Sequence, residues 1–306
     1  MTQGSGILQP RPLIGVGAMM LTTIVVPMMG VFVKILHGFG LNSTEMLAIR
    51  SVIVTLVLLP GLLWAVNRAA LIAADKKAHL LHAAFGLSSM ACFYYAFQFM
   101  PLVIVTAINF TTPIFLVLMA RFLFGEQLGW RSWVAISVGF LGALIVLQPA
   151  ALDVGPVAAV VVLGSFLGAC MLMAIRRMPA RSSNFAVIFY FSIFGTMAFG
   201  GLYLPWMDVP PRESWWSLLA LAALALAVHS LLTFAYRFSS SMLVGALDYT
   251  RLIWAGLLGW YLFNETPQTS DGVGMILILA SGFYILYRES RGRGGATSKT
   301  AAKRLE

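Results

Sequence analysis

Ten apolar segments, each about 20 residues long, follow one another along this chain of 306 residues. A helix that crosses a bilayer needs about 20 apolar residues, because each residue advances it by about 1.5 Å. Segments of that length, joined by short connections, predict an all-α integral membrane protein and leave no room for a soluble domain. The predicted spans are residues 13–36, 43–66, 78–99, 102–124, 129–149, 156–177, 183–205, 214–236, 241–263 and 270–288.

Composition supports a membrane protein, because only 10% of the residues are charged, whereas soluble domains carry about a quarter. The net charge of +9 is explained by basic residues beside membrane helices, which act as orientation signals, so we expect no nucleic-acid partner. Cys92 and Cys170 lie inside apolar segments and are predicted to pack there rather than form a disulfide or a metal site. The expected partners are the lipid bilayer and a small-molecule substrate, with no cofactor or metal, and we expect a monomer.

The distribution of lysine and arginine predicts the orientation of the chain, because connections on the cytoplasmic side carry the excess of these residues. With the N-terminus inside, the outer connections hold only Lys34 and Arg212, while Arg50 and Arg251 fall within or near the membrane. We therefore expect both termini to be cytoplasmic. The inner set is Arg11, Arg68, Lys76, Lys77, Arg121, Arg131, Arg176, Arg177, Arg181, Arg237 and six residues of the C-terminal tail.

The chain resembles itself at an offset of 139 residues. Five spans in each half is an odd number, so the second half is predicted to lie upside down relative to the first. Inverted repeats are typical of alternating-access transporters, whose substrate site lies near the midplane between the halves. The aligned stretches are Ala96-Phe97-Gln98-Phe99 with Ala235-Tyr236-Arg237-Phe238, Asn109-Phe110 with Asp248-Tyr249, and Phe124-Gly125-Glu126 with Phe263-Asn264-Glu265.

These paired stretches, residues 96–126 and 235–265, resemble the drug/metabolite transporter superfamily and specifically its EamA-type exporters, which are built as two five-helix repeats. Within that family the chain looks most similar to bacterial YddG-type exporters of aromatic amino acids. In the fourth span Pro113 fits the family, but its counterpart is Leu252, so a proline-based bend cannot be assumed in both halves. The fifth spans are rich in glycine, at Gly139, Gly142, Gly272, Gly274 and Gly282.

The resemblance implies a multi-pass protein of the bacterial inner membrane that exports amino acids, aromatic and other neutral ones, or related small metabolites. The expected domains are residues 1–12 as a cytoplasmic N-terminal tail, 13–149 as the first repeat, 150–288 as the second repeat and 289–306 as a disordered cytoplasmic tail.

Polar side chains within the spans are the candidate substrate-binding residues, because ionisable groups in a membrane are costly and usually face a partner or a wet cavity. Asp248 and Arg251 stand three apart on the ninth span, a spacing that fits either a structural ion pair or a contact with substrate or protons. Asn109 and Asp248, with the neighbouring rings of Phe110 and Tyr249, are expected to meet at a shared centre, which suits a zwitterion with a large apolar side chain.

Four further binding candidates are Tyr94, Gln98, His229 and Trp254. The first three belong to polar stripes on the third and eighth spans, and Trp254 follows Arg251 by one turn. The alternatives are that Tyr94 anchors the helix in an aromatic belt and that His229 is a hydrogen-bonded core residue.

Three residues are candidate hinges, namely Pro27, Gly30 and Pro113. Proline removes a helical hydrogen bond, and Pro27 is expected to interrupt the first helix, either as a site or as a harmless kink. In contrast, Glu45 follows Asn42-Ser43-Thr44 and is expected to cap the second helix. The spacing of Gly164 and Gly168 is typical of close helix packing.

Two alternatives to amino-acid export stay open. One is a proton-coupled multidrug or cation exporter, although small relatives in the superfamily use a buried glutamate in the first helix and the first predicted span has no acid. The other is a membrane enzyme acting on lipid, which is less favoured because the sequence has no H-E-x-x-H and no G-x-S-x-G. We therefore expect no enzyme and no catalytic residues, and both facilitated efflux and proton antiport remain compatible with the sequence.

Overall fold

All regular secondary structure in the described part of the chain is helical. Among the residues that the structure describes, six helices are long and apolar enough to cross a membrane, and four shorter apolar helices accompany them. In chain order these helices match the ten predicted spans, so the chain is an all-α membrane protein of two inverted five-helix repeats. The computed structural model describes residues 12–72, 74–124, 130–150, 155–176, 183–203, 208–239, 244, 247–266, 269, 272–284 and 287.

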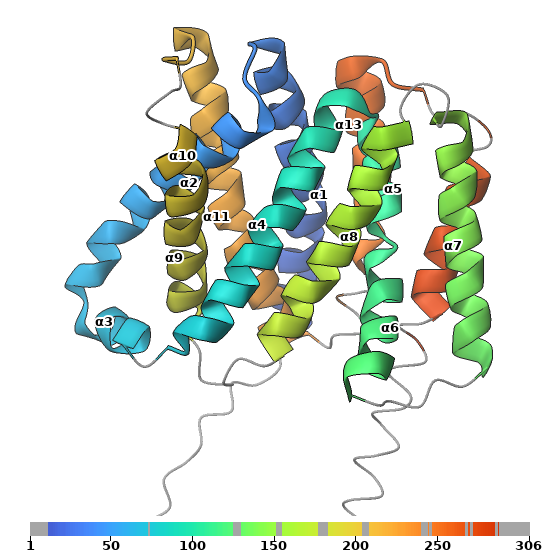
Figure 1. Ribbon diagram of the computed structural model, residues 1–306, viewed down its shortest axis with the longest axis horizontal. Coiled ribbons are helices and arrows are strands. Elements are labelled where there is room, and N and C mark those ends of the chain that lie inside the picture. The colour runs from blue at the N-terminus through green and yellow to red at the C-terminus, as the bar shows by residue number, and fades with distance from the viewer. Residues whose placement is uncertain are drawn as a thin grey trace, which may run out of the picture.

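The first repeat contains five spans. Its fourth span is divided into α5 (Leu102–Asn109) and α6 (Thr112–Phe124) (Figure 1). Between the second and third spans the chain adds the short helices η1 (Leu59–Leu63) and α3 (Ala65–Ile72). The spans are α1 (Pro12–Gly38), α2 (Ser43–Leu58), α4 (Lys76–Phe99), α5 with α6, and α7 (Trp130–Ala150).

The second repeat follows the same order. It consists of α8 (Gly155–Arg176), α9 (Asn184–Gly195) continued by η2 (Thr196–Gly200) and α10 (Gly201–Tyr203), η4 (Arg212–Ser214) leading into α11 (Trp215–Phe238), α13 (Arg251–Phe263), and a helix over Gly272–Tyr284.

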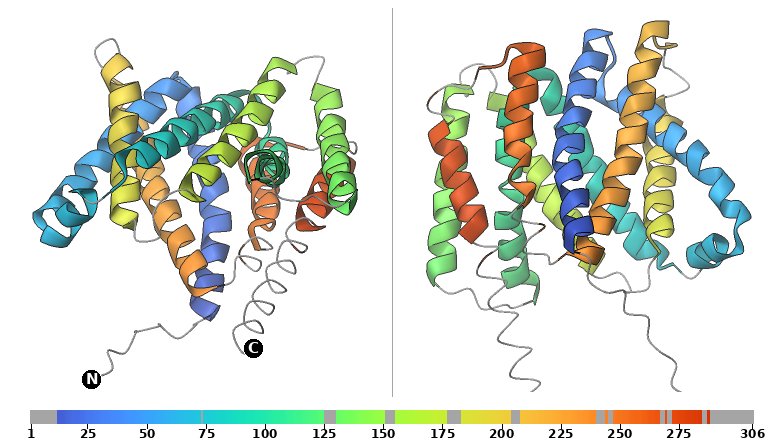
Figure 2. Two further views of the ribbon diagram at one scale, coloured as in Figure 1. Left: turned by 60° about the horizontal axis from the view of Figure 1, so that its bottom comes forward. Right: turned by 180° about the vertical axis from the view of Figure 1, so that it is seen from behind.

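The two repeats interlock, because helices of one half pack along helices of the other. The most extensive packing is between α4 and α8 and between α1 and α11. At one edge of the bundle α7 stands beside the helix Gly272–Tyr284 (Figure 2). Residues from both halves therefore line the interfaces at which alternating-access transporters rearrange.

Small residues permit the close contact between α4 and α8, as predicted for Gly164 and Gly168. A Cβ atom added at Gly164 would lie 2.9 Å from the Cβ of Cys92, and one at Gly168 would lie 3.3 Å from the Oγ of Ser89. The Ser89 hydroxyl donates to the carbonyl of Gly164 at 2.7 Å. The helix backbones thus approach closely enough for a hydroxyl to bridge them.

The second helix begins with the predicted cap. The Asn42 side chain accepts a hydrogen bond from the backbone of Glu45 at 3.0 Å, and the Glu45 carboxylate accepts one from the backbone of Asn42 at 2.8 Å. This reciprocal capping box satisfies two backbone donors at the helix end. The prediction that Glu45 is a capping residue is confirmed.

The prediction that Pro27 interrupts the first helix is wrong, because α1 runs unbroken from Pro12 to Gly38. Proline removes a single helical hydrogen bond, and the packing of α1 along α11 holds both sides of the proline in one helix. Gly30 has a packing role, since a Cβ there would lie 2.9 Å from Leu102 and 3.2 Å from Phe97.

Candidate functional site

The fourth span of each repeat breaks at the same place. In the first repeat a turn at Phe110–Thr111 separates α5 from α6, and in the second a turn at Tyr249–Thr250 precedes α13. The two turns are separated by the 139-residue offset found in the sequence. Broken helices near the middle of a membrane bundle are where transporters place their sites.

A threonine closes both breaks in the same way. The Thr111 hydroxyl donates to the carbonyl of Ile108 at 2.7 Å, and the Thr250 hydroxyl donates to the carbonyl of Leu247 at 2.8 Å. Each threonine N–H also bonds the same carbonyl, at 2.9 and 3.0 Å. In the first repeat the Ser165 hydroxyl of α8 also donates a hydrogen bond to the carbonyl of Ile108, at 3.3 Å. The carbonyls of Ile108 and Leu247 at the two breaks are therefore hydrogen-bonded within the protein, as a membrane interior requires.

Proline is not required for such a break, because the second repeat breaks without one. The first break lies before Pro113, which is the second residue of α6, and Leu252 occupies the same position in α13. In the first turn of a helix a proline loses no helical hydrogen bond. The helix interruption before Pro113 has a threonine turn in both halves, and the role of Pro113 as a hinge stays a prediction.

The two breaks bring together the two rings that the sequence placed at a shared centre, whereas no contact among the described residues joins Asn109 to Asp248. The rings of Phe110 and Tyr249 lie 4.8 Å apart between centroids, tilted by 35°. The Arg251 guanidinium lies 4.8 Å above the Phe110 ring, and one of its nitrogens is 3.4 Å from a carboxylate oxygen of Asp248. The side-chain amide oxygen of Asn109 accepts a hydrogen bond from the Thr112 hydroxyl at 3.0 Å. We call Asn109, Phe110, Asp248, Tyr249 and Arg251 the crossing site.

Two donors of the crossing site have no partner. The Tyr249 hydroxyl and the Nε atom of Arg251 are buried and make no hydrogen bond within the described residues. A buried donor without a partner costs free energy. Both groups are therefore suited to a ligand that brings an acceptor.

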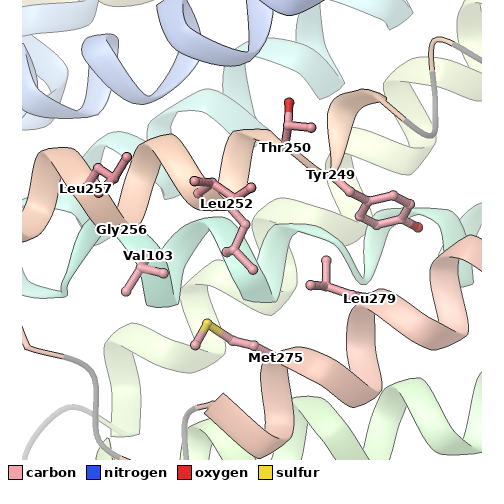
Figure 3. Close-up of a pocket in the computed structure, with 9 residues that line it drawn as sticks. Val103, Tyr249, Thr250, Leu252, Gly256, Leu257, Met275 and Leu279 are labelled. Atoms are coloured by element: carbon pink, nitrogen blue, oxygen red, sulfur yellow. The ribbon is translucent and has the colours of Figure 1, made fainter.

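An apolar groove of about 560 Å³ opens beside the crossing site (Figure 3). Val103 of α5, Leu252 of α13 and Met275 of the helix Gly272–Tyr284 face one another across it, with Tyr249 at one end. Ile253 and Leu257 on its rim are exposed. Apart from Tyr249 and Thr250 the groove is lined by apolar residues, so it offers few polar groups to a substrate.

A second polar group lies on the other side of α4. Arg50 of α2 is 3% exposed, and one of its terminal nitrogens lies 2.6 Å from the sulfur of Met90 and 3.4 Å from the Tyr94 hydroxyl. Met90 packs against the cluster that contains Phe191 of α9, and the Phe191 ring lies 5.6 Å from the ring of His229 on α11. We call Arg50, Met90, Tyr94, Phe191 and His229 the Arg50 group.

Sequence reasoning placed Tyr94 and His229 among the binding candidates but missed Arg50, which contacts Tyr94. The sequence did contain a signal for Arg50, because a charged residue one third of the way into the predicted span 43–66 is unusual. Gln98 and Trp254 join neither group by a hydrogen bond, ion pair or ring contact within the described residues. The Nε2 atom of Gln98 is buried without a partner, and Trp254 is partly buried on α13.

One buried ion pair links the halves at the end of the bundle where α13 ends. Lys34 of α1 lies 2.6 Å from a Glu265 carboxylate oxygen, and the other oxygen accepts a hydrogen bond from the N–H of Leu102 at the start of α5 at 2.8 Å. Asn264, with φ of 56°, turns the chain so that Glu265 folds back against Gly259. Glu126, the repeat counterpart of Glu265, lies outside the described residues.

The fold and the site together define a class of protein. The chain is a multi-pass membrane bundle, and its two inverted halves meet at paired helix breaks. These features are typical of small-molecule transporters. The model of the EamA-like transporter family matches residues 13–148 and 156–287. The chain therefore belongs to this family of the drug/metabolite transporter superfamily, whose members are transporters rather than enzymes.

Several bacterial transporters are similar over most of their length. The S-adenosylmethionine uptake transporter of Rickettsia bellii is 25% identical, with 91% of this chain and 95% of the relative aligned. The pseudopaline exporter CntI of Pseudomonas aeruginosa is 27% identical over 79% and 85% of the two chains. The riboflavin transporter of Rhizobium johnstonii is 30% identical over 60% and 62%. One solved crystal structure shares the fold, with a TM-score of 0.60 at 18% identity over 90% of this chain and 95% of its own.

Proposed function

We propose that this protein exports amino acids, aromatic and other neutral ones, or related small metabolites, across the bacterial inner membrane by alternating access. The crossing site carries the proposal, because it combines two rings in contact, an ion pair and two buried donors without partners. An amino acid has matching parts, since its side chain packs on rings while its charged ends meet polar groups. With both termini cytoplasmic, as the basic residues favour, the Lys34–Glu265 ion pair faces the outside.

Cation export fits the described residues less well than amino-acid export. Proton-coupled cation export requires an accessible carboxylate in the transport path. Helix α1 contains no acid, and Asp248 is held by Arg251 within the crossing site. The relatives named above include an uptake transporter and an exporter, so they do not fix the direction of transport. Export is proposed here from the resemblance to amino-acid exporters given in the sequence analysis.

Counterflow in proteoliposomes tests the proposal directly. Purified protein is reconstituted with unlabelled phenylalanine inside, and uptake of labelled phenylalanine, tryptophan, alanine and threonine is followed. A carrier is expected to give transient accumulation of the label. No accumulation of any amino acid, or equally fast leakage of an unrelated solute, contradicts the proposal.

Substitution of the ring pair predicts a change in selectivity. In Phe110→Ala, loss of some 40 Å² of apolar contact costs on the order of 1 kcal/mol at about 25 cal/mol per Å², or about five-fold in affinity. Counterflow of phenylalanine and tryptophan is expected to fall by that factor, while alanine and threonine change little because they do not reach the ring. A uniform loss for all four substrates indicates a packing defect and removes Phe110 from the site.

A further inference from the structure

Arg50 is a buried charge that pairs with no acid among the described residues. It lies on α2, seven residues after Ser43, with 3% of its surface exposed. Its Nε atom makes no hydrogen bond within the described residues, and its described hydrogen-bond partners are a thioether and a phenol. Neither partner carries a negative charge. A guanidinium removed from water in this way is destabilising unless an anion joins it.

The acids that the structure describes are engaged or distant. Glu265 pairs with Lys34 and Asp248 with Arg251, while Glu45 and Asp75 cap helices. Asp208 and Glu213 are exposed beside α11. The other five acids, namely Glu126, Asp153, Asp271, Glu289 and Glu306, lie outside the described residues.

The surroundings of Arg50 select a particular kind of anion. From α4 it meets Met90 and Tyr94. Met90 packs against the cluster that contains Phe191 of α9, and the Phe191 ring lies 5.6 Å from the His229 ring and 5.7 Å from the His82 ring. No second lysine or arginine joins Arg50 within the described part of the chain. One fixed positive charge among aromatic and thioether groups suits a monoanion with an apolar body, rather than a phosphate dianion. Arginine is also the side chain whose planar fork matches a carboxylate.

The Arg50 group adjoins the crossing site through one side chain. Phe97 of α4 packs against the core around Phe110 and Tyr249 and also against the core around Tyr94. A ligand whose carboxylate lies at Arg50 therefore has an aromatic surface between it and the paired rings. We propose that Arg50 binds the carboxylate of the transported molecule, an assignment that rests on the proposed amino-acid transport. Because Arg50 is closed from water in this structure, the carboxylate reaches it when the helices separate during the transport cycle.

Binding and stability together test this site in the purified full-length protein. The probes are 3-phenylpropionate, which has a carboxylate and no amine, and phenethylamine, which has an amine and no carboxylate. Melting temperature in detergent is measured with each probe, and phenylalanine counterflow is measured in liposomes. In the wild type, 3-phenylpropionate is expected to raise the melting temperature and phenethylamine is not.

Arg50→Met is the informative variant, because methionine fills similar space without a charge. Without ligand it is expected to melt at or above the wild-type temperature, since a buried charge that pairs with no described acid has been removed. Its response to 3-phenylpropionate is expected to vanish, and phenylalanine counterflow to fall by at least about ten-fold, as loss of a charged hydrogen bond predicts. Arg50→Lys keeps the charge but not the fork and is expected to retain part of the response. Arg68→Gln, at an exposed position, serves as the control and is expected to match the wild type.

Separate readouts distinguish failure of the site from failure of the proposed function. If 3-phenylpropionate stabilises the wild type but not Arg50→Met, the carboxylate site stands even when no amino acid gives counterflow. The assignment is overturned if the wild type does not respond to 3-phenylpropionate, or if Arg50→Met keeps the response. It is also overturned if Arg50→Met melts well below the wild type, because Arg50 then supports the fold.

Discussion

Replacing Glu265 with glutamine is expected to destabilise the protein by about 3 kcal/mol, seen as a melting temperature lower by roughly 6–12 °C. The carboxylate lies 2.6 Å from the Lys34 ammonium, and the two side chains are only 10% and 16% exposed. Glutamine can still accept the hydrogen bond from Leu102, but it leaves the lysine without a counter-ion. A buried charge that loses its partner costs more than the intact pair contributes.

A double-substitution cycle separates this pairing from a general packing defect. Lys34→Met combined with Glu265→Gln removes both charges and is expected to recover most of the lost stability. The exposed acid Glu213 provides the control, and Glu213→Gln is expected to change the melting temperature by no more than about 1 °C. If the double variant is as unstable as Glu265→Gln alone, the Lys34–Glu265 pair is not the source of the effect.

The same ion pair connects stability to the transport cycle. Lys34 belongs to the first repeat and Glu265 to the second, and Glu265 also holds the first N–H of α5. Separation of the repeats at this end of the bundle must break these contacts. Glu265→Gln is therefore also expected to shift the protein toward conformations open at this end, which a cysteine placed nearby reports as faster labelling. Equal labelling of variant and wild type speaks against a role in closure.

The fold was predictable because its main signals are local. An apolar segment is recognised from about 20 consecutive residues, and a capping box such as Asn42–Glu45 is recognised from four. The contact between Phe110 and Tyr249 is long-range, yet the repeat offset and the odd number of spans were enough to predict it. The internal repeat thus predicted a contact between residues far apart in the sequence, which a single sequence without a repeat does not do.

The Arg50 group was not predictable in the same way. Arg50 meets Met90 and Tyr94, which are 40 and 44 residues away, and neither belongs to a motif with it. The repeat offset gives no help either, because it relates Arg50 to residue 189, a phenylalanine. The prediction that Pro27 interrupts the first helix was wrong for the opposite reason. Proline does remove a local hydrogen bond, but the packing of α1 against α11, which is distant in sequence, keeps α1 continuous.

The contact between the fifth helices of the two repeats leads to the last prediction. A Cβ atom added at Gly142 of α7 would lie 2.7 Å from the carbonyl oxygen of Gly274 and 2.9 Å from the backbone nitrogen of Ile278. Backbone atoms cannot rotate away as side chains do, so any side chain at residue 142 must push the two helices apart. The glycines at this contact are therefore required by space rather than by backbone conformation.

Gly142→Leu is expected to lower the stability of the folded protein by about 2–3 kcal/mol, the upper range for overpacking. Gly272→Leu on the facing helix is the matched control, because a Cβ there meets nothing within 4 Å. Melting temperature and the monodisperse fraction in detergent measure both variants, which carry the same added side chain and the same loss of glycine. Since leucine favours helix over glycine, Gly272→Leu is expected to be neutral or slightly stabilising. Equal behaviour of the two variants would show that α7 and its partner helix do not depend on this close approach.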